Sequence, residues 1–190
     1  MPFLSRDSIE KMGFKSLGKG VLISDKASIY NANQIEIGDN SRIDDFCVIS
    51  GNITIGKHVH IAAQTLLAGG EQGIILGDFS GCAYAVQIFS QSDDYSGKTL
   101  TNPTVPVEFK NEFKKKIVIG KHVIIGASSI ILPGVEVAEG CSVGAMSMVT
   151  KSTEPWGIYF GVPAKKLKNR KQDLLELEKK LLNRDDNDSI

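Results

Sequence analysis

The 190-residue sequence has no net charge and no long apolar run. Lysine plus arginine and aspartate plus glutamate each number 22, so no overall field attracts the protein to nucleic acid or to an anionic membrane. Nowhere do about 18 consecutive apolar residues occur, which is the length that a membrane-spanning helix needs. We therefore expect neither a nucleic-acid partner nor insertion into a membrane.

The sequence also has few cysteines and no secretory signal at its start. The first residues, MPFLSRDSIEKMGF, lack the apolar stretch of a signal peptide, so we expect a cytoplasmic protein. Cys47, Cys82 and Cys141 are odd in number and widely spaced, which argues against a disulfide framework and against a zinc knuckle. We expect all three to be small buried apolar residues.

What the sequence does contain is an apolar residue at every sixth position. The set, in which only the cysteine is not Ile, Leu or Val, comprises Ile37, Ile43, Ile49, Ile55, Ile61, Leu67, Leu76, Cys82, Ile88, Ile119, Ile125, Ile131, Val137, Val143 and Val149. A period of six fits neither an α-helix nor an alternating strand. It is the period of a β-solenoid, in which three six-residue faces close a coil of about 18 residues.

The repeat divides the chain into three parts. Residues 17–154 are predicted to form an all-β parallel solenoid of about six coils, which Leu17, Ile23 and Ile29 extend weakly toward the N-terminus. Residues 1–16 are predicted to be a lead-in with a short helix capped by Ser5 or Asp7. In residues 155–190, leucines alternate with charged residues after a turn, which predicts an amphipathic helix that packs on a coil or on a neighbouring subunit.

One long polar segment, residues 89–116, interrupts the repeat. It contains SQSDDYSGKTLTNPTVPVEFKNEFKKK and has none of the six-residue period. A loop of this length inside a compact fold is uncommon and is usually functional. We expect it to project from the solenoid and to serve a binding site.

The repeat also separates the three histidines. Residues 55–61 are IGKHVHI and residues 119–125 are IGKHVII, so His58 and His122 occupy the same position of the repeat. Recurrence at one position indicates a structural role at a corner of the coil. His60 has Ile124 as its counterpart, and it should point outward because Val59 and Ile61 point inward. An outward imidazole is either idle in solvent or a general base.

Three motifs follow the repeat in order: LPGV, VGAMSMVTKS and GVPAKKL. With the six-residue period and the loop, they make residues 17–170 resemble the hexapeptide-repeat acyltransferases, especially the sugar acetyltransferases that act on galactosides, maltose and xenobiotics. The resemblance implies a left-handed parallel β-helix, a homotrimer, and acetyl-CoA bound between subunits with no metal required. It also implies that the loop of one subunit walls the acceptor site.

The same resemblance assigns binding residues. The coenzyme A contacts of the family correspond here to Ala127, Ala145, Thr150, Lys151, Gly161, Pro163 and Lys165. Small residues would let the pantetheine arm lie against backbone amides, and the lysines would meet the phosphates of CoA. In the loop, Gln91, Tyr95 and Asn102 are candidates for acceptor binding.

The sequence departs from the galactoside type at the catalytic base. That type carries its catalytic histidine early in the loop, where this chain has Gln91, which cannot abstract a proton. The base is then His60, or Asp93 or Asp94, or the reaction needs none of consequence. Our hypothesis is that His60 deprotonates a sugar hydroxyl or amine while Asp93 or Asp94 orients the imidazole or the sugar. An amine acceptor would need little help from a base.

The expected activity is therefore acetyl transfer from acetyl-CoA to a hydroxyl or amine of a sugar, with a nucleotide-linked sugar for cell-surface polysaccharide synthesis as the preferred acceptor. The segments SQSDDYSG and TNPTVP are similar to those of a surface-polysaccharide subgroup. Two alternatives remain, a non-catalytic solenoid scaffold and a zinc enzyme like the γ-carbonic anhydrases, although the spacing of the three histidines is unlike that class.

Overall fold

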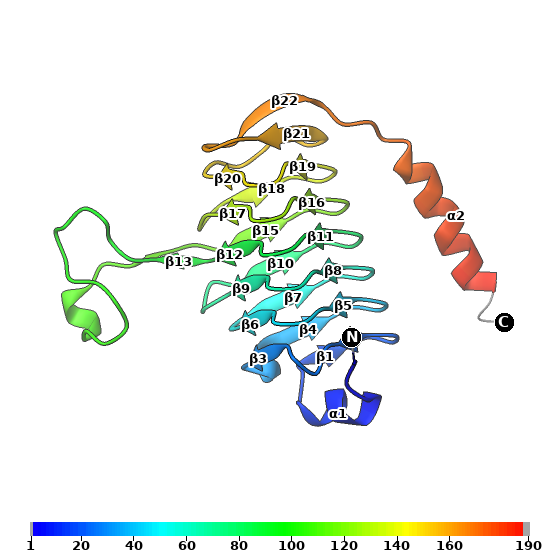
Figure 1. The fold of residues 1–190 in the computed structure, drawn as a ribbon, viewed down its shortest axis with the longest axis horizontal. Coiled ribbons are helices and arrows are strands. Elements are labelled where there is room, and N and C mark those ends of the chain that lie inside the picture. Colours follow the sequence, from blue (N-terminus) through cyan, green and yellow to red (C-terminus); the bar gives the residue numbers. More distant parts are fainter. Residues whose placement is uncertain (1, 188–190) are drawn as a thin grey trace.

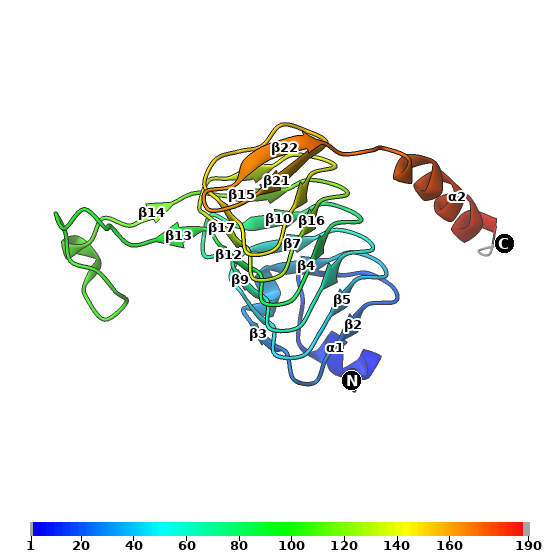
Figure 2. The same cartoon turned by 45° about the horizontal axis from the view of Figure 1, so that its top comes forward.

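The computed structural model describes residues 2–187, and residues 1 and 188–190 of the predicted terminal segments lie outside it. The chain forms a parallel β-solenoid of about seven turns, with a short helix before it and a longer helix after it. Figure 1 shows the stacked coils, with the 89–116 loop projecting on one side and the C-terminal helix lying on the other. The turned view of Figure 2 keeps the loop and this helix on opposite sides.

Three parallel sheets form the faces of the coil. The first sheet contains β1 (Ser16–Leu17), β4 (Ile35–Ile37), β7 (Ile53–Ile55), β10 (Ile74–Leu76), β15 (Ile117–Ile119) and β18 (Glu136–Val137). The second sheet contains β2 (Leu22–Ile23), β5 (Arg42–Ile43), β8 (His60–Ile61), β11 (Gly81–Cys82), β16 (Ile124–Ile125), β19 (Ser142–Val143), β21 (Gly157–Phe160) and β22 (Lys165–Asn169). The third sheet contains β3 (Ser28–Tyr30), β6 (Val48–Ser50), β9 (Leu66–Ala68), β12 (Gln87–Phe89), β17 (Ile130–Ile131) and β20 (Met148–Val149).

The six-residue pattern is the core of the solenoid. All 15 residues of the predicted set are buried, none more than 3% exposed. They stack in register along each sheet; in the first sheet, for example, Ile55 pairs with Ile37 and Leu76. Each such aliphatic side chain contributes roughly 1.5–3 kcal/mol by leaving water. The repeat and the parallel solenoid are confirmed, whereas the left-handed sense of the coil stays a prediction.

Both ends of the solenoid are closed. The predicted first helix is α1 (Arg6–Lys11), whose N-cap is Ser5, with its hydroxyl accepting from the amide of Ser8. Ile9 of this helix is buried against the first coil. At the other end, β21 adds a turn to the about six predicted coils. Tyr159 lies opposite Val143 there and is buried, but it is neither aliphatic nor in the six-residue spacing, so the repeat did not reveal this turn.

The predicted loop leaves the third sheet after β12 and returns to the first sheet at β15. Its base is an antiparallel pair, β13 (Gln91–Ser92) with β14 (Phe113–Lys114), and it carries the short 3-10 helix η2 (Val107–Phe109). A second 3-10 helix, η1 (Ala32–Gln34), lies at the same corner of an earlier coil. The C-terminal helix is α2 (Leu174–Asn187).

The three cysteines are free and buried, as the sequence predicts. Burial raises the pKa of the Cys82 thiol to about 12, with a smaller contribution from Cys47. Cys82 is therefore protonated and inert at neutral pH. Between residues 2 and 187, the structure contains no helix with the length and apolar character to cross a membrane.

Candidate active site

The corner between the first and second sheets is a column of stacked rings, which we call the aromatic corner: His58, Phe79, His122 and Trp156. All four residues have positive φ, between 54° and 60°, because each stands at the same left-handed turn of its coil. The Phe79 ring stacks on His58 at 4.7 Å and on His122 at 5.3 Å, and Trp156 lies 6.4 Å beyond His122. The structural role expected for His58 and His122 is therefore what the structure shows.

Within this stack, the coil between those of His122 and Trp156 carries no ring. Gly140 stands between the coils of His122 and Trp156, also at positive φ. A Cβ atom at this position would lie 2.3 Å from the Trp156 indole. The missing side chain thus gives the indole room to reach over Gly140 toward His122.

Helix α2 is fixed to the aromatic corner by charged groups. Glu178 accepts from His122 Nε2 at 2.8 Å and pairs with Lys121 Nζ at 2.5 Å. Burial alone would raise the pKa of Glu178, but the hydrogen bonds from Lys121 and His122 outweigh it and hold the pKa below its usual value. Arg170, just before the helix, donates from Nη1 to the carbonyl oxygens of His122 at 2.7 Å and Gly140 at 3.0 Å.

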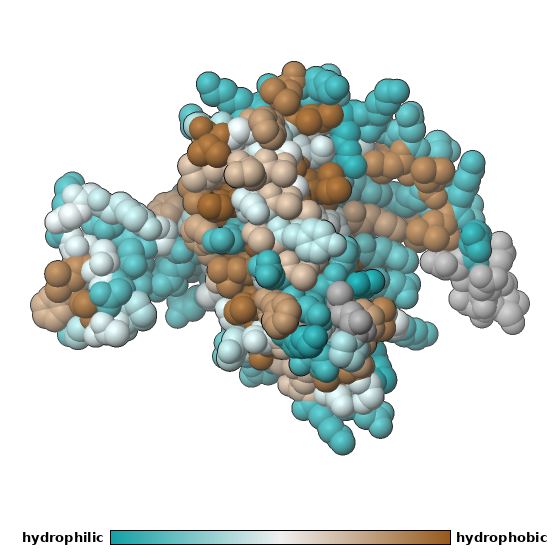
Figure 3. All heavy atoms as spheres, viewed as in Figure 1, coloured by the Kyte–Doolittle hydropathy of each residue, from teal (hydrophilic) through white to brown (hydrophobic). Residues whose placement is uncertain are grey.

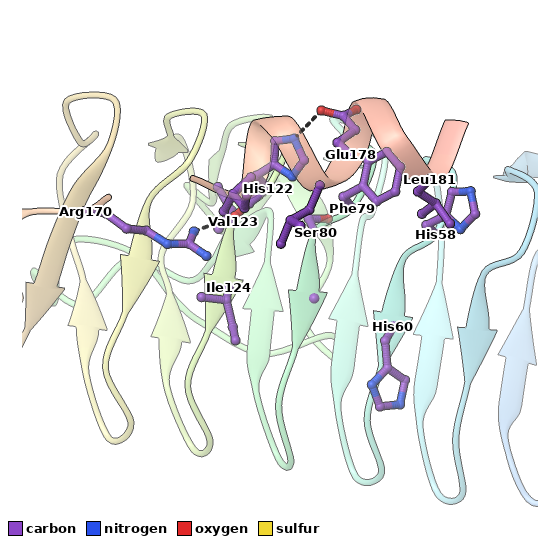
Figure 4. A pocket seen from close by; sticks show the side chains of 13 residues that line it. His58, His60, Phe79, Ser80, His122, Val123, Ile124, Arg170, Glu178 and Leu181 are labelled. Carbon is purple, nitrogen blue, oxygen red and sulfur yellow. Dashed lines mark hydrogen bonds and ion pairs between the residues drawn. The ribbon is translucent and has the colours of Figure 1, made fainter. Parts of the chain in front are cut away.

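A groove of about 500 Å³ lies between α2 and the second sheet. Figure 4 shows His122 joined to Glu178 at this corner, while His60 lies on the face of the strands, apart from the stacked rings. Leu177, Leu181 and Leu182 of α2 are exposed, and apolar side chains are visible along the helix in Figure 3. The helix therefore has apolar surface that the solenoid of its own chain does not cover.

His60 points outward, as predicted, and is held by a carboxylate that the sequence did not single out. Its Nε2 lies 2.9 Å from Oδ2 of Asp44, a residue 3% exposed, and Oδ1 of Asp44 accepts from Arg42 Nε at 2.6 Å. Burial alone would raise the pKa of Asp44, but the hydrogen bonds from Arg42 and His60 hold it below its usual value. Asp44 is therefore ionised at neutral pH and accepts from Nε2 of His60, which leaves Nδ1 as the ring nitrogen that this carboxylate does not engage.

Beside His60 the second sheet is hollowed. Gly81 is the neighbour of His60 in the parallel register, and it leaves a hollow of about 210 Å³ bounded by Ala62, Ala83 and Ile124 among others. The hollow is thus open to the imidazole on one side and apolar on the others.

The corner between the second and third sheets has small residues on consecutive coils, and we call it the small-residue corner: Ala62, Ala63, Ala83, Ala85, Gly126, Ala127, Gly144 and Ala145. Backbone hydrogen bonds join its coils, with the amide of Ala85 donating to Ala63 O at 3.0 Å and that of Met146 to Ala127 O at 2.8 Å. A Cβ atom on Gly126 would lie 2.4 Å from the amide nitrogen of Ala145, so the coils approach closely here. Two predicted CoA residues, Ala127 and Ala145, lie on this corner.

The other predicted CoA residues continue toward the last turn. The amide of Met148, which follows Ala145 on the same coil, donates to Gly161 O at 3.0 Å, so Gly161 lies on the adjoining coil. Thr150, Pro163 and Lys165 are exposed, and each is within five residues of Ala145 or Gly161 in the sequence. Lys151, Lys165 and Lys168 are exposed, and within residues 2–187 they form no ion pair, so their charges are free for phosphates.

Most of the loop candidates hold the loop itself together. Asp94 accepts from the Ser96 hydroxyl at 2.9 Å and amide at 2.8 Å and from Thr99 Oγ1 at 3.0 Å, which lowers its pKa. Asp93 Oδ1 accepts from the amide of Asn102 at 3.3 Å, and the Asn102 side chain accepts from Thr104.

Two loop candidates differ in their surroundings. Gln91 donates from Nε2 to Glu112 Oε1 at 3.0 Å at the base of the loop. Tyr95, in contrast, is 93% exposed at the far end and is available for a contact outside its own chain.

Within one chain, the loop and His60 do not meet. The loop starts from the third sheet, whereas His60 stands on β8 of the second sheet, and the loop projects away from the solenoid (Figure 1). The carboxylate that orients the imidazole in the chain is therefore Asp44 rather than Asp93 or Asp94. Residues 2–187 contain no group of three or more His, Cys, Asp or Glu side chains that could hold a metal ion.

Comparison with known proteins decides the family. The family model for the bacterial transferase hexapeptide (six repeats) matches residues 34–69 and 116–151. The dTDP-4-amino-4,6-dideoxy-D-glucose acyltransferase of Escherichia coli is 43% identical over 181 residues, which cover 94% of each chain. This chain belongs to the hexapeptide-repeat acyltransferases. It is an acyltransferase, so the scaffold and carbonic anhydrase alternatives are set aside.

Solved structures from this family are also similar to the chain. AntD, an N-acyltransferase from Bacillus cereus in complex with dTDP and 3-hydroxybutyryl-CoA, matches with a TM-score of 0.95 at 50% identity, covering 97% of this chain and 98% of that chain. A variant of AntD has been solved with dTDP-4-amino-4,6-dideoxyglucose and coenzyme A, and it matches with a TM-score of 0.94 at 51% identity over 96% and 97% of the two chains.

The maltose branch, to which the sequence motifs also pointed, is more distant. A maltose O-acetyltransferase from Clostridium difficile 630 matches with a TM-score of 0.56 at 24% identity, covering 88% of this chain and 75% of that chain. At that identity, the similarity shows only that the two proteins share the solenoid fold.

Proposed function

We propose that this acyltransferase moves the acyl group of an acyl-CoA onto the 4-amino group of dTDP-4-amino-4,6-dideoxyglucose or a closely related nucleotide-linked aminosugar. The observation that carries this proposal is the near full-length similarity, at 43% and 50% identity, to one enzyme named for that acceptor and to an N-acyltransferase seen with dTDP and an acyl-CoA. It favours an amine over a hydroxyl acceptor, an alternative that the sequence leaves open.

The reaction needs one proton to move from nitrogen to sulfur. The neutral amine attacks the thioester carbonyl, the C–N bond forms, and the C–S bond breaks with its electron pair leaving on sulfur. The nitrogen loses one proton and the departing thiolate gains one, so that the products are an amide and free CoA thiol. In our proposal, Nδ1 of His60 accepts the proton from nitrogen and returns it to sulfur, while ionised Asp44 holds Nε2 and stabilises the transient imidazolium.

Asp93 and Asp94 keep a role in the proposal as residues of the acceptor site. With its lowered pKa, Asp94 is a weak base near neutral pH but a suitable partner for a protonated amine. Gln91, Tyr95 and Asn102 would bind the sugar or the nucleotide from the same loop. A neutral amine is a good nucleophile toward a thioester, so the demands on any base are modest.

The active site is proposed to form between chains of a homotrimer. The loop and His60 lie on different faces of one chain, and a loop that reaches a neighbouring subunit would bring Tyr95 and Asp94 to that subunit's His60. The uncovered leucines of α2 are also consistent with subunit packing. Size-exclusion chromatography with light scattering tests this: a monomeric enzyme with full activity would contradict the shared site.

Acyl-CoA is proposed to lie along the small-residue corner. Its pantetheine arm would run over Ala127 and Ala145, with Thr150, Gly161 and Pro163 around the last turn, and its phosphates would meet Lys151 and Lys165. Acetyl-CoA is the donor expected from the sequence, and AntD has been seen with 3-hydroxybutyryl-CoA, so acetyl-CoA and a four-carbon acyl-CoA are the donors to compare.

The test is release of CoA thiol from acetyl-CoA in the presence of separate acceptors. Turnover with dTDP-4-amino-4,6-dideoxyglucose, and none with maltose or a neutral galactoside, is the expected result. Mass spectrometry should show one acetyl group on the aminosugar nitrogen. Turnover confined to hydroxyl acceptors would contradict the proposal and make a true base necessary.

A nucleotide-linked acceptor fits synthesis of cell-surface polysaccharide in the cytoplasm, which is part of the proposal. A strain without the protein should assemble a surface glycan in which the aminosugar lacks its N-acyl group. An unchanged glycan would contradict a role of the enzyme in synthesis of the surface polysaccharide.

A further inference from the structure

The outward column of the second sheet has one position without a side chain. Successive coils place Arg42, His60, Gly81, Ile124 and Ser142 side by side in the parallel register. Only position 81 of this run is glycine. The gap lies directly beside the residue that we propose as the base.

The fold itself does not require glycine at position 81. A Cβ atom built there would meet a single neighbour within 4 Å, His60 O at 3.6 Å, which is an ordinary contact. The φ angle of Gly81 is not in the left-handed region, unlike that of Gly140. Since glycine weakens a strand interior, its presence without a backbone reason indicates that the space above it is used.

That space is a defined hollow of about 210 Å³. Its walls are Ala62, Ala83, Tyr84 and Ile124, with His60 at one end. Tyr84 is 65% exposed and Ile124 is 50% exposed, so two large apolar side chains of this lining stand at the surface beside the missing one. The volume is that of roughly seven waters at about 30 Å³ each, which is ample for an acyl group of a few carbons.

The hollow lies where the thioester would end. Backbone hydrogen bonds connect the coil of Ala127 to that of Tyr84, through Ser128 N to Tyr84 O at 2.9 Å, and the coil of Ala85 to that of Ala63. Adjacent coils are about 4.8 Å apart. A pantetheine arm that passes Ala127 therefore reaches the level of Ala83 and His60 one or two coils later, roughly 5–10 Å along the axis.

We propose that the hollow above Gly81 receives the acyl chain of the CoA thioester, and that the missing side chain at position 81 sets how long that chain can be. This inference rests on the proposed function and names its donor: an acyl group of about four carbons fits as well as acetyl. Cys82, although next to Gly81, is buried and points into the core, so the acyl group passes directly to the acceptor rather than through a cysteine thioester.

The test compares donors in the wild-type protein, Gly81→Ala and Gly81→Val. The ratio of kcat/KM for butyryl-CoA to that for acetyl-CoA is measured with dTDP-4-amino-4,6-dideoxyglucose as acceptor. Gly81→Val should lower this ratio about tenfold or more, mainly through KM for the donor, because a hydrophobic pocket discriminates each methylene by roughly 10-fold to 200-fold. Gly81→Ala should lower it less.

Ser142→Val is the matched control. It adds the same side chain at the outward position of the same sheet, two coils from Gly81 and outside the hollow. This control should leave the donor ratio unchanged. Because valine suits a strand, the Gly81→Val protein should unfold at a temperature no lower than wild type. If its turnover with both donors is too slow to measure, the ratio of dissociation constants for butyryl-CoA and acetyl-CoA should show the same change.

Two results would overturn the inference. The first is a donor ratio that is the same in Gly81→Val and wild type. The second is an equal loss with both donors and a raised KM for the aminosugar, which would assign the hollow to the 6-methyl group of the acceptor. Absence of turnover with any acyl-CoA in the wild-type protein would instead contradict the proposed function, so the two failures are distinguishable.

Discussion

Two corners of the solenoid have similar backbones and opposite surfaces. Both turn through residues with positive φ, such as His122 at 60° in the aromatic corner and Ala85 at 57° in the small-residue corner. In the first, rings stack on one another from coil to coil and α2 is fixed to them by charged groups. In the second, alanines and glycines leave the backbone open to a ligand. The same repeat therefore builds one corner that its own side chains close and one that they leave free.

The largest effect is expected from filling the open corner. Ala127→Trp should raise the dissociation constant for CoA about 100-fold or more, because the indole would occupy the path of the pantetheine arm. Isothermal titration with CoA measures it. Asn40→Trp, one coil before His58 at the corner between the first and second sheets and far from the proposed CoA path, serves as control and should bind CoA as wild type does. Equal binding by Ala127→Trp would move the CoA path elsewhere.

The next effect concerns the face between the two corners. His60→Ala should lower kcat about 10-fold to 100-fold, near the low end of what a general base contributes, because a neutral amine attacks readily. Asp44→Asn should cost less and should shift the acidic limb of the pH–kcat profile, since the amide no longer stabilises an imidazolium. A profile identical to wild type in Asp44→Asn would make this carboxylate merely structural.

The closed corner should affect stability rather than activity. Phe79→Ala removes the ring between His58 and His122, and it should lower the free energy of unfolding by about 1–3 kcal/mol through lost stacking and packing. Urea unfolding measures the change, and kcat/KM should stay within about twofold of wild type. A large loss of activity at unchanged stability would give this corner a role in catalysis.

The smallest effect is expected at α2. Because the pKa of Glu178 is lowered from 4.5, the stability it contributes is complete above that value and is lost as pH falls through the lowered pKa. Amide hydrogen exchange in residues 174–182 should thus be slow at pH 7. Glu178→Gln should speed it several-fold while leaving exchange in the coils unchanged. Equal exchange in the two proteins would show that other contacts hold the helix.

Much of this architecture follows from the sequence because the core of a solenoid is periodic. Each buried aliphatic residue predicts the next one, and two histidines at one repeat position predict a corner. Asp44 was missed because its partner His60 is not its register neighbour on the next coil; His60 pairs with Arg42, two residues earlier in the chain. Yet Arg42 and His60 are 18 residues apart and so lie side by side, and Asp44 shares the outer face with Arg42. The period could thus have placed this carboxylate near the imidazole.

Other features have no periodic signal. Phe79 and Trp156 join the aromatic corner although the three-residue slip and the shorter last coil remove them from the 18-residue spacing. The internal hydrogen bonds of Asp93 and Asp94 depend on the irregular path of the loop. In the sequence, the hollow above Gly81 is marked only by one glycine among 19. Only the positions of the neighbouring coils show that the backbone would accept a side chain at residue 81.

The strand that ends the solenoid also determines how the protein behaves at high concentration. A stack of parallel strands has an open edge on which a second stack could grow. Here β22 turns back antiparallel to β21 and covers that edge with Lys165, Lys166 and Lys168, all exposed. Pairing of two such edges would bring lysines of like charge together, which disfavours it. Lys165, which is proposed to meet the phosphates of CoA, thus also belongs to the edge that disfavours such pairing.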